Sequence, residues 1–280
     1  MANIEEIKKL VNEFYSLDYK KDTDKLTNIF QKILVSRNNL ALESGFENYF
    51  EMQKNHIQKI PDNEYAYFEK QKTNFSNTFN PQLIGFSLPV HFLFSVAQLD
   101  ISFPDGVLKL FNEFQEIENV KNKINLISNS ETASFKFLSE SEKYIVNIPK
   151  TNPNQKIAML IHELSHIVCQ ERSDHKINSV YESEKGALEI ERIITKKIST
   201  DFYLANLREY LMCFVRSEFE KLIFQNPSQN ISKTYLTTLE KYLGKPDNDM
   251  EFKYLIDDRI IMKPLTDLSS SVALVNLTQI

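Results

Sequence analysis

Glycine is scarce in this chain, and that scarcity limits the folds it can adopt. Only five of its 280 residues are glycine, whereas an average globular chain of this length carries roughly twenty. Folds rich in sheets and tight turns need glycine wherever the backbone takes a positive φ angle. Leucine, isoleucine and phenylalanine also recur at the three- and four-residue spacing of amphipathic helices. The chain is therefore predicted to be mainly α, an α+β fold with a small antiparallel sheet.

Charge and hydropathy exclude several classes of partner. A net charge of −5 provides no basic surface for nucleic acid or for a membrane of anionic lipid, so neither is expected as a partner. No apolar run approaches the ~18 residues that cross a bilayer. The N-terminal segment has the pattern of an amphipathic helix with acidic residues, and Cys169 and Cys213 lie in apolar helical patterns. We expect reduced cysteines and a cytoplasmic location, or secretion without an N-terminal signal.

Hydrophobic periodicity divides the chain into helices and one hairpin. Alternating β-rich segments at 134–138 and 144–148 flank a polar turn. The prolines in 80–100 predict a loop followed by a short buried helix. The change from helices to hairpin near 130 predicts an N-terminal helical subdomain, 1–130, and a second subdomain, 131–280, within one continuous unit. Helices are predicted at 3–15, 23–35, 39–58, 63–75, from about 105, at about 156–171 and then to about 224, with a break at 226–230.

The sequence LIHELSHIV, residues 160–168, places two histidines four residues apart on a predicted helix. Positions i and i+4 share a helix face, so His162 and His166 can bind one ion at the about 2.0–2.1 Å that zinc prefers. Glu163, about 100° further round the helix, can reach a water on that ion and act as general base. The alternative is a structural helix whose histidines bond to carbonyls or carboxylates. The HExxH pattern favours a catalytic Zn²⁺ cofactor.

A zinc site on this helix needs at least one more protein ligand. One known pattern would place a glycine and a histidine three and six residues after His166, but Cys169 and Arg172 stand there. The ligand must then come from a second helix packed across the first. The segment SVYESEKGALEIERIITKK offers four candidates: Glu182, Glu184, Glu189 and Glu191.

Helical spacing ranks these four carboxylates. Glu182, Gly186 and Glu189 fall at i, i+4 and i+7, on a single face. The small Gly186 between the two glutamates would allow the two helices to approach closely. We therefore favour Glu182 as the metal ligand and Glu189 as a hydrogen-bonded support of the site, and place Glu184 and Glu191 on a solvated face. Glu184 and Glu189 are the alternative ligands.

HELSH followed by YESEKGALE resembles the thimet oligopeptidase and oligoendopeptidase F family of zinc peptidases, and ESEKGALE is also similar to a segment of the carboxypeptidase Taq family. In the first family a later helix carries a ligand glutamate and a second glutamate seven residues on, which is the separation of Glu182 and Glu189. Weaker similarities at 37–53 and 208–224 extend the likeness over most of 37–224. The resemblance implies a zincin-like catalytic half, residues 131–280, and an N-terminal helical part that enclose a cleft.

The chain also departs from that family. Family members are commonly much longer, and their interval between the second histidine and the ligand glutamate is longer than that from His166 to Glu182. The C-terminal stretch lacks the tyrosine and histidine that stabilise the oxyanion in the family. Tyr254, just upstream, is the candidate replacement. His175 is a candidate contact to substrate, or an exposed residue without a role.

The implied function is zinc-dependent hydrolysis of peptide bonds, with Glu163 as the base and oligopeptides as the expected substrate. An extended peptide can add as a strand along the edge of the hairpin. Two alternatives use the same features. One is an effector- or toxin-type zinc protease that cleaves a single protein target, and the other is a zincin-fold binding protein that has lost turnover.

Overall fold

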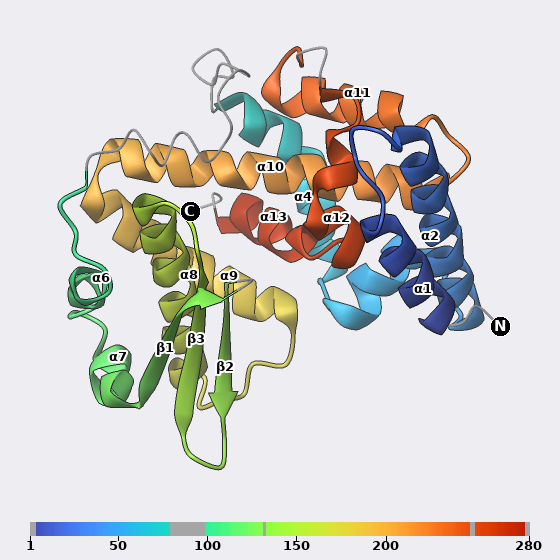
Figure 1. Ribbon diagram of the computed structural model, residues 1–280. Helices are drawn as coiled ribbons and strands as arrows, with labels where there is room; N and C mark the ends of the chain where they lie inside the picture. Colours follow the sequence, from blue (N-terminus) through green and yellow to red (C-terminus); the bar gives the residue numbers. More distant parts are fainter. Residues whose placement is uncertain (1–3, 79–98, 131–132, 247–249, 278–280) are drawn as a thin grey trace. The chain divides into compact units, whose positions relative to one another are not determined.

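The computed structural model describes residues 4–78, 99–130, 133–246 and 250–277. Over these residues the fold is mainly α with one small sheet, as predicted (Figure 1). None of the helices in the described ranges combines the length and apolar character that a bilayer span requires. The loop and buried helix predicted for 80–100 fall almost entirely outside the described residues.

The chain divides into two compact units. Unit 1 comprises residues 1–87 and 211–276, and unit 2 comprises residues 88–210 and 277–280. The border predicted at residue 130 differs from this division. Residue 130 ends a strand, β1 (Ile124–Ser130), that pairs with β3 (Lys143–Pro149), so both sides of the predicted border belong to one sheet.

Unit 1 consists of helices over its described residues. In Figure 1 its first two helices, α1 and α2, are drawn in blue and run side by side. The break predicted after residue 35 is absent, because Arg37 and Asn38 use their polar side chains for long-range hydrogen bonds and leave the helix intact. The helices of unit 1 are α1 (Ile4–Tyr15), α2 (Thr23–Glu43), α3 (Tyr49–Met52), the π-helix η1 (Gln53–Ile57), α4 (Asp62–Thr78), the second half of α10 (Thr200–Gln225), α11 (Ile231–Leu243), the 3₁₀-helix η5 (Lys253–Ile256), α12 (Asp258–Met262) and α13 (Asp267–Asn276).

Unit 2 carries the sheet and two long helices packed against each other. The helix predicted from residue 105 is short and is followed by a second short helix rather than continuing. The break predicted at 226–230 is confirmed, since α10 ends at Gln225. The elements of unit 2 are α6 (Asp105–Leu110), α7 (Gln115–Val120), the 3₁₀-helix η3 (Lys121–Lys123), β1, β2 (Ser134–Leu138), β3, α8 (Pro153–Arg172), α9 (Val180–Ile198) and the first half of α10.

The sheet is mixed, not antiparallel as predicted. The predicted hairpin is confirmed, since β2 and β3 pair antiparallel from Ser134 opposite Asn147 to Leu138 opposite Lys143. However, β1 pairs with β3 in parallel, in the order β1-β3-β2. The sequence gives no clear strand pattern for β1, because its second half is polar and the side chain of Ile127 is exposed. One edge of β2 therefore has no strand partner among the described residues.

Helix α8 packs on the sheet and is central to the core of unit 2. Tyr144, Val146 and Ile148 alternate along β3 and are buried on one face, and α8 lies across the sheet (Figure 1). The helix begins at Pro153, earlier than predicted, because Asn152 accepts a hydrogen bond from the Gln155 amide and proline suits the first helical position. The buried apolar residues of α8 are Ile157, Ala158, Leu160, Ile161, Leu164, Ile167 and Val168.

Helices α8 and α9 approach closely at Gly186. A Cβ atom placed on Gly186 would lie 2.7 Å from the Sγ atom of Cys169 and 3.5 Å from its Cβ atom. The first distance is shorter than side chains tolerate, so an alanine here would push the two helices apart or displace the thiol. The close approach predicted from this glycine is confirmed.

We predict that Gly186→Ala lowers the free energy of unfolding by about 1–3 kcal/mol, the usual cost of overpacking a core contact. The measurement is urea unfolding of the wild type, of both single variants and of the Cys169→Ala/Gly186→Ala double variant. The double variant should recover most of the loss, because it removes the sulfur atom that the new methyl group meets. A double variant as unstable as Gly186→Ala would contradict this explanation.

Candidate metal centre

Three side chains from α8 and α9 converge within unit 2. The Nε2 atoms of His162 and His166 are 3.1 Å apart. The carboxylate of Glu184 lies 3.4 Å from Nε2 of His166 and 3.8 Å from Nε2 of His162. One ligand atom from each of the three residues lies within 4.8 Å of the other two.

These spacings fit the requirements of a zinc ion. Ligands at about 2.0–2.1 Å from a tetrahedral zinc stand about 3.3 Å apart. The two Nε2 atoms, at 3.1 Å, and the pair formed by Oε1 of Glu184 and Nε2 of His166, at 3.4 Å, are close to this separation. The donor set, two imidazole nitrogens and one carboxylate oxygen, is also one that zinc accepts at sites with an open fourth position. The side chains of Glu184 and His162 are 18% and 24% exposed, so the cluster retains access to solvent.

Each histidine of the cluster is also hydrogen-bonded through its Nδ1 atom to a side chain of α9. Nδ1 of His162 is hydrogen-bonded to Oε2 of Glu191 at 2.8 Å, and Nδ1 of His166 is hydrogen-bonded to Oγ of Ser183 at 2.9 Å. Burial by itself disfavours a charged His162. The hydrogen bond to Glu191 and the negative charges of Glu191, Glu184 and Glu163 outweigh it and raise the pKa of His162 to about 10. The surroundings of His162 therefore favour positive charge.

Glu163 is buried beside the cluster. Its residue exposure is 6%, and burial raises the pKa of its carboxyl group above the usual value, against the opposing effect of the two histidines. A buried carboxyl group with a raised pKa next to a possible metal site is the environment expected of a general base.

The structure does not place Glu182 or Glu189 at this cluster. Both side chains lie on the exposed face of α9. Ser179 caps α9 by accepting a hydrogen bond from the Glu182 amide, and the Glu182 carboxylate accepts one from the amide of Asn178. The pattern S-x-x-E at 179–182 is typical of a capping box, in which the glutamate stabilises the start of the helix. Glu182 therefore caps α9 and does not face the histidines, which corrects the ligand predicted from spacing alone.

Glu184 and Glu191 occupy the places predicted for Glu182 and Glu189. They share a helix face with the buried residues Tyr181, Leu188 and Thr195, at the a and d spacing of an amphipathic helix. The two glutamates near the histidines are seven residues apart, as in the predicted pair, but each lies two positions further along α9. The large apolar residues Tyr181 and Leu188 on the same helix face were the sequence signal that could have pointed to Glu184 and Glu191.

Two further predicted contacts with substrate are not supported by the positions of their side chains. Tyr254, predicted to stabilise an oxyanion, is fully buried and packs against the rings of Phe30 and Phe219. His175 is 34% exposed, and its ring stacks on Phe137 of β2 with centroids 4.1 Å apart. The stacking gives His175 a packing role between α8 and the edge strand.

A second stacked pair joins β2 to the candidate centre. The ring of Phe135 lies against that of His166, with centroids 5.0 Å apart and planes 14° from parallel. Because Phe135 and Phe137 alternate along β2, both rings point to the same side of the sheet. The edge strand is therefore packed directly on one of the two imidazoles of the cluster.

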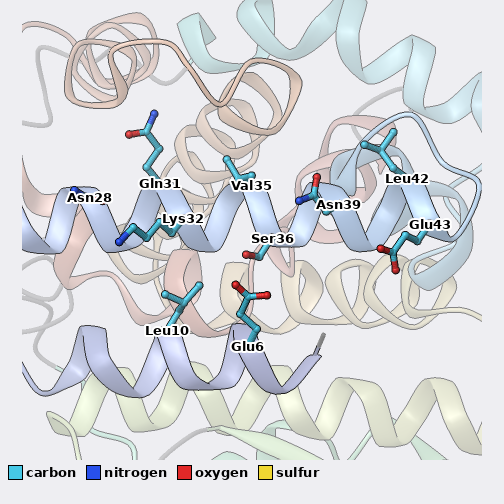
Figure 2. A pocket seen from close by; sticks show the side chains of 10 residues that line it. All are labelled: Glu6, Leu10, Asn28, Gln31, Lys32, Val35, Ser36, Asn39, Leu42 and Glu43. Carbon is cyan, nitrogen blue, oxygen red and sulfur yellow. The ribbon is translucent and has the colours of Figure 1, made fainter. Parts of the chain in front are cut away.

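An open groove elsewhere in the molecule lacks comparable chemistry. It has a volume of about 720 Å³ and lies between α1 and α2 of unit 1, as Figure 2 shows. Leu10, Val35 and Leu42 contribute its apolar surface, and the other lining side chains are amides, carboxylates, a lysine and a serine, with no histidine or cysteine. We therefore assign the reactive chemistry to the cluster in unit 2.

Comparison with known proteins identifies the fold but no sequence relative. No protein-family model matches the chain, and no curated protein matches its sequence. A solved structure of PZ peptidase A with an inhibitor matches with a TM-score of 0.67 and 12% identity, covering 91% of this chain and 55% of the other. A structure of oligoendopeptidase F matches with a TM-score of 0.61, at the same identity and coverage.

A third match extends the comparison to oligoendopeptidase F from Bacillus anthracis. It has a TM-score of 0.53 and 12% identity, and covers 87% of this chain and 53% of the other. The chain spans about half the length of the structures it matches. It has the oligoendopeptidase-like zincin fold that its HExxH segment suggested.

Proposed function

We propose that this chain is a zinc-dependent peptidase in which His162, His166 and Glu184 hold the metal and Glu163 is the general base. The observation that carries the proposal is the convergence of the two imidazoles and the Glu184 carboxylate at the spacing of zinc ligands. The peptidase fold supports it, since the chain matches peptidases over 91% of its own length.

The roles proposed for the metal and for Glu163 follow from their chemistry. When bound, Zn²⁺ would lower the pKa of a coordinated water toward about 7 and polarise the carbonyl of the scissile peptide bond. Glu163 accepts the proton of the attacking water and delivers it to the leaving amine. Burial raises the pKa of Glu163 above the usual carboxyl value, which suits both steps because it helps the group to hold the proton between them.

The edge of β2 is the proposed site for the substrate backbone. This strand has no partner on its outer edge among the described residues, and its Phe135 is stacked on His166. An extended peptide that pairs with β2 would run beside the metal ligands and make main-chain hydrogen bonds with little demand on sequence. We therefore propose unstructured oligopeptides as the substrate class.

A non-catalytic binding protein is the second candidate. The buried position of Tyr254 favours it, because this tyrosine was the candidate for stabilising the oxyanion and its ring is enclosed by other aromatic residues. Such a protein would keep the metal and the helices without turnover.

We predict that Glu184→Gln weakens zinc binding by more than about 100-fold, beyond the 10–100-fold typical of residues that only support a ligand. Glu182→Gln should bind zinc like the wild type, because Glu182 caps α9 and faces away from the histidines. The measurement is zinc content after dialysis and affinity by competition with a chromogenic chelator. Loss of zinc in Glu182→Gln but not in Glu184→Gln would contradict the ligand assignment.

We also predict that Glu163→Gln retains about one equivalent of zinc while its hydrolysis of a fluorogenic peptide library falls by about 10²–10⁴-fold. Glu189→Gln makes the same chemical change on the exposed face of α9 and should remain active. A wild-type protein that holds zinc but cleaves neither peptides nor proteins would favour the non-catalytic candidate. Cleavage of one folded protein, with the peptide library left intact, would point to an effector-type protease.

A further inference from the structure

The Glu191 side chain accepts hydrogen bonds from two residues of a third helix, α10. Its carboxylate is almost completely buried, with 1% residue exposure. Asn206 and Tyr210, four residues apart on α10, both reach it: the Asn206 side-chain amide donates to Oε1 at 2.6 Å, and the Tyr210 hydroxyl donates to Oε2 at 2.7 Å. The i, i+4 spacing places both donors on the same face of α10.

These contacts account for both oxygens of the carboxylate. Oε2 is shared between the Tyr210 hydroxyl and Nδ1 of His162, and Oε1 takes the Asn206 amide. Oε2 of Glu191 already accepts from the Tyr210 hydroxyl, and we assign it as the acceptor from Nδ1 of His162 as well. The other ring nitrogen, Nε2, faces His166 and Glu184, so this arrangement makes it the nitrogen that a metal would use.

We propose that Asn206 and Tyr210 are positioning residues that set the metal affinity of the centre through Glu191 and His162. This inference rests on the proposed function, because it needs His162 to be a ligand. Without the two donors from α10, the Glu191 carboxylate could rotate about its terminal bond and lose its alignment with Nδ1. The imidazole would then lose the contact that fixes the direction of Nε2.

The burial of Asn206 and Tyr210 indicates that their polar groups are needed at these positions. Asn206 and Tyr210 are 5% and 8% exposed, and they continue a face of α10 that begins with Phe202 at 0%. Apolar side chains would fill these positions without the cost of burying polar atoms. The Asn206 amide and the Tyr210 hydroxyl therefore both lie within hydrogen-bond distance of the buried Glu191 carboxylate.

The test uses three single variants of the full chain. Tyr210→Phe removes one oxygen atom, and Asn206→Leu removes the amide at similar volume. Tyr242→Phe is the matched control: Tyr242 is 1% exposed, and its hydroxyl has no hydrogen-bond partner among the described residues. Zinc dissociation constants are measured by chelator competition. The absorption spectrum of the Co²⁺-loaded protein reports ligand geometry, and thermal unfolding of the metal-free protein reports stability.

We expect Tyr210→Phe and Asn206→Leu each to weaken zinc binding by about 10-fold or more and to alter the Co²⁺ spectrum. Tyr242→Phe should change neither. Zinc affinities and spectra equal to the wild type in both α10 variants would overturn the inference, even if metal-free stability falls, because a purely structural role predicts that result. A wild-type protein that binds no zinc would instead overturn the proposed function itself.

Discussion

Close packing of α8 against α9 is the constraint on which the candidate centre depends. The two imidazoles come from α8 and the Glu184 carboxylate from α9, so their separations of 3.4 and 3.8 Å exist only at this interhelical distance. The absence of a side chain at Gly186 permits that distance, since the thiol of Cys169 fills the available space. The contact between Gly186 and the Cys169 thiol thus controls how close the Glu184 carboxylate lies to the two imidazoles.

The second constraint is the concentration of acidic groups in a poorly solvated place. Glu163 and Glu191 are buried, Glu184 is mostly buried, and all three lie around two imidazoles. Buried carboxylates are costly unless they are paired with charge or hydrogen-bonded. In the metal-free chain this environment favours a proton on His162, and a divalent cation at the same position would satisfy the same carboxylates. Under the proposed function, protons and metal would therefore compete for one site, and metal binding would be coupled to the stability of the fold.

Sequence patterns predicted the helices and the hairpin better than the packing between them. The helical content, the HExxH helix and the β2–β3 hairpin follow from periodicity, because local spacing alone determines which residues share a face. The parallel strand β1 could not be predicted, because it is held by a long-range pairing and half of its residues are polar. The choice between Glu182 and Glu184 required the phase of α9, and the capping pattern at Ser179 was the local signal that assigns Glu182 to the helix start. The hydrogen bonds from Asn206 and Tyr210 of α10 to Glu191 could not be predicted, because they depend on how α10 packs against α9.

The division into two units also affects the order in which parts of the chain can fold during synthesis. Unit 2 is almost continuous in the chain, at 88–210, whereas unit 1 combines residues 1–87 with 211–276. During synthesis from the N-terminus, the histidine-bearing unit is therefore nearly complete once α10 has begun to emerge from the ribosome. The apolar faces of the first 87 residues are covered only after the last quarter of the chain has been made. A nascent chain whose residue 210 has just left the ribosome would thus contain a nearly complete unit 2 and an N-terminal segment that still lacks its partner helices and is prone to aggregate.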